Sequence, residues 1–189
     1  EQWGVAARAV DLLDVKGDVE ALLAPLVARF ESGVHPALHP GRSARVLLDG
    51  RPIGWLGELH PRWQKKYELP QPAVLFELDA APLIAIGLPR ILEPSKFPPV
   101  VRDLAVVVDS GQPAGALLDA LASEKPRFVQ EIRLFDLYLG KGIPEGRKSL
   151  AFRIVMQDTD RTLTDEEADL AITKMVELLA RRFAATLRT

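Results

Sequence analysis

The sequence predicts an α+β protein whose second half forms a βαββαβ sheet, and three observations lead to this prediction. Residues 149–157 alternate strictly between core-facing apolar positions and outward positions, which is typical of a strand with one buried face. Thr164 and Glu167 stand three residues apart before an apolar stripe, which indicates a helix start. Four prolines in residues 89–99 indicate an extended linker, because proline lacks an amide hydrogen and restricts its neighbour. We therefore expect two domains, 1–93 and 94–189.

The composition is that of a folded chain and excludes several kinds of site. Apolar residues make up 48% of the 189 residues, which is enough for a core. No apolar run has the length that a membrane-spanning helix needs. Cysteine is absent, which excludes disulfides, thiolate nucleophiles and Cys-ligated zinc. The chain does not begin with Met, so we expect it to be a segment of a longer polypeptide.

The charge balance argues against a general nucleic-acid binder. The net charge is −2, whereas a protein that binds phosphate without selectivity is usually basic. Residues 1–93 hold 10 Lys and Arg against 12 Asp and Glu, and residues 94–189 hold 14 of each. Any contact with RNA must therefore be made by a local group of residues.

In the first half we expect one helix and about three strands. Asp18 can cap a helix whose apolar residues recur at helical spacing as far as Phe30. Residues 35–42 are expected to form a loop, and Asp49-Gly50 predicts a tight hairpin. The strands are expected at residues 44–48, 53–58 and 73–78, with a helical turn at 62–66. So few elements leave a sheet face uncovered, and this half is expected to need an absent part of its chain or a partner.

In the second half the order βαββαβ predicts a ferredoxin-like split sheet with two helices on one face. The strands are expected at residues 103–109, 129–139, 149–157 and 185–188. One helix begins near Pro113, with Leu117, Leu118 and Leu121 inward. The other follows Thr164 and buries Ala168, Ile172, Met175, Val176, Leu179 and Phe183.

The other face of this sheet is expected to be open, and alternation predicts which residues lie on it. Leu150, Phe152, Ile154 and Met156 should face the helices, as should Leu104, Val106, Val108, Phe135 and Leu137. In this topology the first and third strands are neighbours, and the second lies next to the third. The open face then collects Ala105, Asp136, Tyr138, Ser149 and Arg153.

These residue types suit single-stranded RNA, because a ring stacks on a base while carboxylate, hydroxyl and guanidinium groups contact its edge or phosphate. Arg147 and Lys148 flank the turn at residues 140–146 and could contact phosphate. An outward tyrosine beside an arginine is also ordinary on a half-exposed sheet. Alternation alone therefore leaves the function of this face open.

Three further motifs do not predict a site. His35 and His39 are four residues apart, but the prolines beside them disfavour a helix and no third zinc ligand is evident. Residues 142–149 (GIPEGRKS) are similar to a phosphate loop, but they lie between two strands. The acidic residues Asp165, Glu166 and Glu167 complement a helix N-terminus. We find no catalytic constellation.

The second half resembles a known family along its whole length. PSKFPPVVRDLAVVVD, LFDLYLGKGIPEGRKSLAFRIVMQD and RTLTDEEAD resemble the ferredoxin-fold anticodon-binding domain that closes bacterial phenylalanyl-tRNA synthetase beta subunits. In the first half, VKGDVEALL, HPGRSARVLLDGRPIGWLGELHP and FELD resemble the tail of the catalytic-like domain of the same subunit. That domain is similar to the class II synthetase core but is inactive.

The resemblance implies a cytoplasmic enzyme of two alpha and two beta subunits, which joins phenylalanine to its tRNA with ATP and magnesium. Its active site lies in alpha and its editing site in an earlier part of beta. The resemblance thus implies that this segment alone is not an enzyme, holds no cofactor or metal and does not contact a membrane. Its implied partners are the anticodon stem-loop of phenylalanine tRNA, the alpha subunit and a second beta subunit.

The resemblance also implies roles for single residues. In the family the tyrosine that matches Tyr138 stacks on the first anticodon base, and the positions that match Ser149, Asp136 and Ala105 line the anticodon pocket. Leu139 stands where many relatives are expected to carry a basic residue, so a phosphate contact is not expected there.

Two other interpretations remain open. One is a regulatory domain of the same topology that binds amino acids at a paired sheet edge. Such a domain would need a glycine-rich loop after its first strand, of which residues 110–113 (SGQP) are a weak version. The other is a structural segment that docks subunits, which large apolar exposure on residues 1–93 would support.

Overall fold

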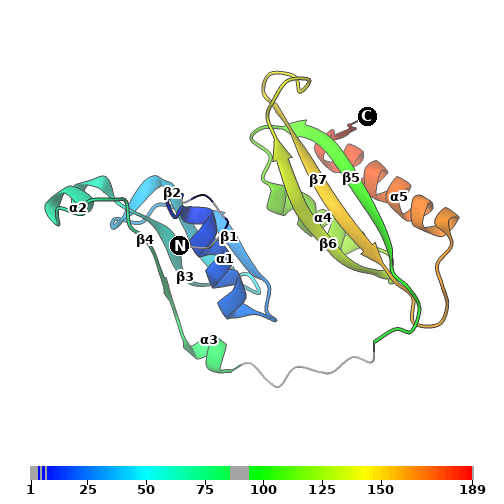
Figure 1. The fold of residues 1–189 in the computed structure, drawn as a ribbon, viewed down its shortest axis with the longest axis horizontal. Coiled ribbons are helices and arrows are strands. Elements are labelled where there is room, and N and C mark those ends of the chain that lie inside the picture. The colour runs from blue at the N-terminus through cyan, green and yellow to red at the C-terminus, as the bar shows by residue number, and fades with distance from the viewer. Residues whose placement is uncertain (1–3, 5, 7, 86–93, 189) are drawn as a thin grey trace. The chain divides into compact units, whose positions relative to one another are not determined.

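The chain divides into two compact units, Glu1–Ile91 and Leu92–Thr189, in a computed structural model that describes residues 4, 6, 8–85 and 94–188 (Figure 1). The domain boundary expected near residue 93 lies outside the described residues. None of the helices in the described part is both long and apolar enough to cross a membrane.

The first unit is an antiparallel four-stranded sheet in the order β1-β2-β3-β4, with α1 packed on one face (Figure 1). The strands are β1 Ala28–Ser32, β2 Leu38–Leu48, β3 Arg51–Leu59 and β4 Val74–Leu78, and the helices are α1 Leu12–Leu23, α2 Pro61–Lys66 and α3 Ala81–Ile84. Its core is small, because among the described residues Val19 and Leu23 of α1 pack on only four other buried apolar residues, Val46, Leu48, Ile53 and Leu56.

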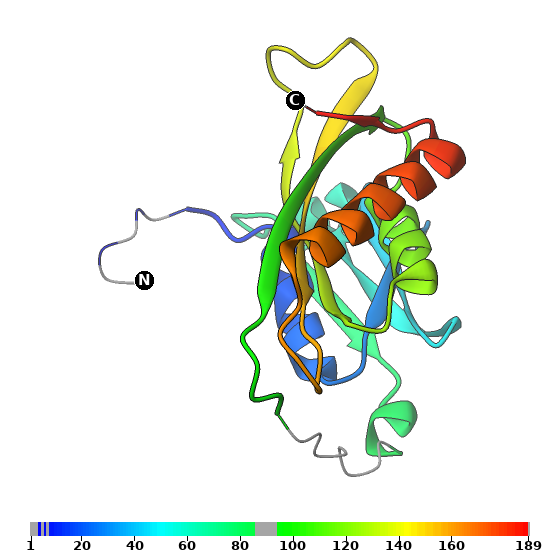
Figure 2. The same cartoon turned by 90° about the vertical axis from the view of Figure 1, so that its right-hand side faces the viewer.

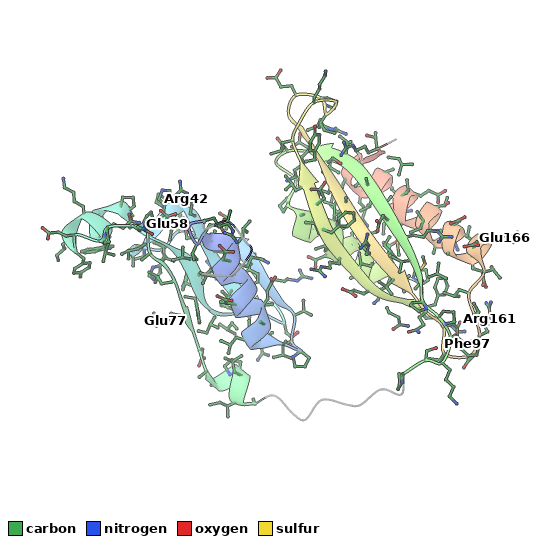
Figure 3. The ribbon with its side chains drawn as sticks, in the orientation of Figure 1. Arg42, Glu58, Glu77, Phe97, Arg161 and Glu166 are labelled. Atoms are coloured by element: carbon green, nitrogen blue, oxygen red, sulfur yellow. The ribbon has the colours of Figure 1, made fainter. Side chains whose placement is uncertain are left out.

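The predicted hairpin between β2 and β3 is confirmed. Asp49 and Gly50 both have a positive φ, 48° and 76°, which matches the twist of the flanking strands. Arg42 and Glu58 bridge the two strands, with Arg42 Nη1 2.7 Å from Glu58 Oε2 (Figure 3). This ion pair neutralises a carboxylate whose residue is only 9% exposed.

The first helix exists as predicted, but both of its predicted ends are wrong. Asp11, not Asp18, is the N-cap: its Oδ1 accepts hydrogen bonds from the amides of Leu13 (2.8 Å) and Asp14 (3.1 Å). The helix ends at Leu23 because Pro25 disfavours helical geometry in the residue before it, and Ala24 has ψ 138°. Phe30 lies in β1, although the apolar spacing had suggested one continuous helix.

The expected loop at residues 35–42 is only partly a loop, because β2 begins at Leu38. The pairing with β3 is irregular between Leu38 and Ser43. Pro40 lies in this irregular stretch, where its missing amide hydrogen costs no ladder hydrogen bond. The strand therefore tolerates a proline that had suggested a break.

The second unit has the predicted βαββαβ order, and its sheet runs β6-β7-β5-β8. The elements are β5 Val100–Asp109, α4 Ala114–Glu124, β6 Val129–Tyr138, β7 Arg147–Met156, α5 Asp165–Phe183 and β8 Thr186–Leu187. Both helices lie on one side of the sheet (Figure 2). The ferredoxin-like fold predicted from the sequence is therefore confirmed.

Seventeen buried apolar residues between positions 94 and 188 form the core of this unit. The four residues predicted to face inward from β7, Leu150, Phe152, Ile154 and Met156, are all 0% exposed. The predicted capping box also forms, since the Glu167 amide donates to Thr164 Oγ1 (3.3 Å) and the Thr164 amide to Glu167 Oε2 (3.1 Å). The helices thus shield one face of the sheet, and the other face is available for contacts.

Candidate RNA-binding face

The face of the second sheet that is turned away from α4 and α5 brings together four of the predicted residues. Tyr138 of β6 lies opposite Ser149 of β7, and in the next row Asp136 and Ala105 both lie opposite Ala151. These two rows are adjacent, so Ala105, Asp136, Tyr138 and Ser149 form one group, here called the tyrosine site. The Tyr138 ring and the Asp136 carboxylate are therefore close enough to contact one nucleotide, whereas Ser149 is only 2% exposed.

The position of the Tyr138 ring is fixed by the turn that follows it. Its hydroxyl donates to the carbonyl of Lys141 at 3.2 Å. A Cβ added to Gly140 would lie 2.3 Å from the ring atom Cζ, which is far inside van der Waals contact. Only glycine at position 140 therefore lets the ring keep this place.

Arg188 belongs to the tyrosine site, although the sequence did not single it out. Its backbone amide donates to Ala105 O at 2.9 Å, and its Nη1 is 3.4 Å from Ser149 Oγ. Its guanidinium carbon lies 4.7 Å from the centroid of the Tyr138 ring, within cation–π distance. The pairing of the last strand with the first in a ferredoxin-like sheet is the signal that could have placed it there.

Arg153 lies on the same face but in a different row of the sheet, between Asp103 of β5 and Arg133 of β6. Its Nε and Nη2 donate to the two carboxylate oxygens of Asp103, both at 2.8 Å. This two-pronged bond lowers the pKa of Asp103 below its usual value. Arg153 lies four positions from Ser149 along β7, which is a Cα separation of about 13 Å at the usual strand rise. Arg153 is therefore not part of the tyrosine site.

Phe135 was predicted to face the helices, and this prediction is wrong. The register shifts between Leu134, opposite Phe152, and Asp136, opposite Ala151, so that Phe135 occupies a bulge. The bulge turns the ring to the open face, where it is 49% exposed and lies 5.1 Å from the Arg153 guanidinium. Leu137 pairs with the fully buried Leu150 and keeps the predicted inward direction, although it too is 49% exposed.

The two basic residues beside the turn are held by backbone carbonyls. Lys148 lies opposite the fully buried Val108, on the helix side of the sheet, and its Nζ donates to Ser110 O at 2.9 Å. Arg147 Nη2 donates to Ala184 O at 3.2 Å. The structure therefore does not bring Lys148 together with Tyr138.

The two histidines considered as zinc ligands instead stabilise turns. Nδ1 of His35 accepts from the Ala37 amide (3.3 Å), and Nδ1 of His39 accepts from the Gly41 amide (3.0 Å). In the part of the chain that the structure describes, no group of three or more His, Cys, Asp or Glu is placed to hold a metal ion.

Comparison with known proteins agrees with this geometry. The model of the ferredoxin-fold anticodon binding domain matches residues 95–188, and that of the phenylalanyl tRNA synthetase beta chain CLM domain matches residues 1–80. The chain belongs to the phenylalanyl-tRNA synthetase beta subunit family. The predicted family is thereby confirmed for both halves of the chain.

Members of this family from several bacteria are similar over nearly the whole chain. The phenylalanine–tRNA ligase beta subunit of Dechloromonas aromatica is 57% identical and that of Nitrosospira multiformis 51%, each over all of this chain. The beta subunit of Burkholderia lata is 56% identical over 96% of it. The chain spans 24% of the length of each of these relatives. Which residues contact RNA stays a prediction.

Proposed function

We propose that residues 95–188 bind the anticodon stem-loop of phenylalanine tRNA, as part of an enzyme that attaches phenylalanine to that tRNA. One observation carries the proposal: a fixed tyrosine ring stands on the open face of a domain of the anticodon-binding family. Base stacking on such a ring contributes about 1–3 kcal/mol.

In this proposal Tyr138 stacks on the first anticodon base, while Asp136, Ser149 and Ala105 contact the edge of that base. The register supports these roles, because the four residues lie in two adjacent rows. A base that stacks on the ring face beside Arg188 takes the place of its guanidinium. Arg188 is then released to contact the phosphate of the same nucleotide.

Three further basic residues are proposed to contact the RNA backbone. Arg153 is the best placed, since it is on the open face, where it is half-exposed beside its partner Asp103. Arg147 and Lys148 lie beside the turn and would have to release their carbonyl partners first. Residues 94–189 hold as many acidic as basic residues, so binding should rest on these few contacts.

The remaining proposals concern the whole enzyme, of which this chain is a part. We propose that it is a cytoplasmic assembly of two alpha and two beta subunits, with the active site, ATP and magnesium in alpha. The chain described here then has no ligase activity alone and holds no cofactor. Aminoacylation of tRNA by this chain alone would contradict that proposal.

The first unit is proposed to dock on other parts of the same assembly. Leu13, Val27 and Ile84 are 70%, 84% and 82% exposed, although they are large and apolar. Exposed apolar groups of this kind are typical of surfaces that are covered in an assembly.

The alternative of an amino-acid regulatory domain has less support. The loop after β5 satisfies its own polar groups, since the Gly111 amide donates to Asp109 Oδ1 at 2.8 Å and the Gln112 amide to Asp109 O at 3.1 Å. A loop that binds a ligand through its amides needs them free.

The proposed function can be tested by fluorescence anisotropy of this chain with a labelled anticodon stem-loop, at fixed low salt. Tyr138→Ala should weaken binding by about 1–3 kcal/mol, because the stacking ring is lost. Tyr138→Phe is the matched control: it keeps the ring and removes only the bond to Lys141 O, so most of the affinity should remain. A stem-loop with a changed first anticodon base should bind less tightly to the wild type. If wild type and Tyr138→Ala bind equally, or neither binds, the proposal is wrong.

A further inference from the structure

We infer that Phe135 is a second stacking platform on the open face, which takes an unpaired nucleotide of the RNA other than the one on Tyr138. This inference rests on the proposed function, because it concerns the same RNA. It begins with the bulge in β6, without which regular alternation would have turned the ring to the helices. Leu134 and Ile132 pack against the core in its place.

The surroundings of Phe135 repeat those of Tyr138. Each ring has a guanidinium within cation–π distance, Arg153 at 5.1 Å from Phe135 and Arg188 at 4.7 Å from Tyr138. Each also has an aspartate on the same face, Asp103 held by Arg153 and Asp136 in the row beside Tyr138. A ring, a cation and a carboxylate are the groups with which proteins hold an unpaired base.

The charge near Phe135 fits a nucleotide better than an apolar partner. Arg133 and Arg153 lie opposite one another on the open face, and of the two only Arg153 is bonded to Asp103. The Arg133 guanidinium can contact a phosphate, while the half-exposed ring of Phe135 offers its face to a base. Both the sugar–phosphate chain and the base therefore have a contact there.

The distance along the face assigns the two rings to different nucleotides. Phe135 lies three residues from Tyr138 along β6, in the bulge between Leu134 and Asp136. At the usual strand rise this separation is about 10 Å, whereas stacked bases in one strand follow each other at about 3.4 Å. One base cannot reach both rings, so an RNA strand that crosses the face must contact them with separate nucleotides.

The test is anisotropy of the whole chain with the anticodon stem-loop, comparing Phe135→Ala with Leu137→Ala. The two positions are matched, because both are on β6 and both are 49% exposed, but Leu137 faces the helices. Phe135→Ala should weaken binding about 5- to 150-fold, as expected for one lost stacking contact, and Leu137→Ala should leave it unchanged. Phe135→Trp keeps an aromatic ring and should keep the affinity. Phe135→Leu keeps the apolar bulk that folding needs but has no ring, so it should lose the affinity.

Stem-loops that lack one loop base at a time identify the nucleotide. Removal of the base that stacks on Phe135 should weaken binding to the wild type and have no further effect on binding to Phe135→Ala. Its loop position should differ from that of the base whose removal has no further effect on Tyr138→Ala. If Tyr138→Ala weakens binding but Phe135→Ala or Phe135→Leu does not, this inference is wrong and the proposed function stands. If the wild type does not bind the stem-loop, the proposed function fails, and this inference fails with it.

Discussion

The helices α1 and α5 begin in the same way, yet they contribute differently to their two units. In each, an arginine, the N-cap and the third helical residue stand three residues apart: Arg8, Asp11 and Asp14 in α1, and Arg161, Thr164 and Glu167 in α5. In each, the acid of the capping box also bonds the arginine. The two starts are therefore equivalent in their local chemistry.

Beyond the first turn the two helices differ in what they bury. Over its 19 residues α5 buries five side chains, whereas α1 buries two over its 12 residues. In the part of the chain that the structure describes, the core around α5 contains seventeen buried apolar residues and the core around α1 contains six. A cap determines where a helix begins, but the apolar surface that the helix buries determines how much it stabilises its unit. Three experiments test this difference.

The largest effect is expected from the core of the second unit. Phe152→Ala should lower its free energy of unfolding by about 3–5 kcal/mol, because a fully buried ring leaves a cavity. Leu170→Ala, at a site of α5 that is 56% exposed, is the control and should change stability by less than about 0.5 kcal/mol. Native-state hydrogen exchange reports each unit separately. An equal loss of protection in the first unit would show that the two cores are not independent.

A smaller effect is expected from the caps, and it should differ between the units. Thr164→Ala and Asp11→Ala each remove one capping bond, at a cost of about 0.5–2 kcal/mol. In α5 the loss should lower global stability while the helix persists. In α1, which buries little, the same loss should fray the helix, seen as faster amide exchange at residues 13–18. Equal exchange in both helices would contradict the comparison.

The smallest effect concerns pH. The bond from Arg161, together with the Thr164 amide, lowers the pKa of Glu167 from its ordinary 4.5 to about 2. Arg8 and the Asp11 amide lower the pKa of Asp14 from 3.8 to about 2. Because both values are lower in the folded state, the stabilisation is complete above the ordinary pKa and is lost as pH falls toward 2. Both groups are on the surface, where solvent weakens the effect.

Unfolding between pH 5 and pH 2 therefore provides the measurement. Each unit should become less stable as pH falls, and Glu167→Gln should flatten this dependence in the second unit alone. Asp14→Asn should do the same in the first unit alone. A steeper dependence in either variant would contradict the assignment of these groups.

The sequence predicted the second unit well because its signals are local. The alternation in β7 and the box of Thr164 and Glu167 need no knowledge of distant residues, and both are confirmed. The start of α1 was missed because its box has Asp14, rather than the more usual Glu or Gln, at the third helical position.

The errors in the candidate site have long-range causes. The bulge at Phe135 depends on how β6 is registered against β7, and the sequence of β6 alone does not predict it. Arg188 reaches Tyr138 only because β8 pairs with β5, a contact between residues far apart in the sequence. The fold and the outward positions of Tyr138 and Arg153 could thus be predicted from periodicity, but the positions of Phe135 and Arg188 required the register.

If Tyr138 stacks on a base as proposed, its contact with Gly140 has a consequence for the entropy of binding. A free tyrosine loses rotational freedom when a base stacks on it, and ordering one side chain at an interface costs about 0.5–1.5 kcal/mol. The turn restricts this ring before any ligand arrives, through the hydroxyl bond to Lys141 O and the space that only glycine leaves. The ring is thus preorganised, and more of the stacking energy is available as affinity. Under the proposed function, the residue at position 140 thereby controls how much of that energy is retained.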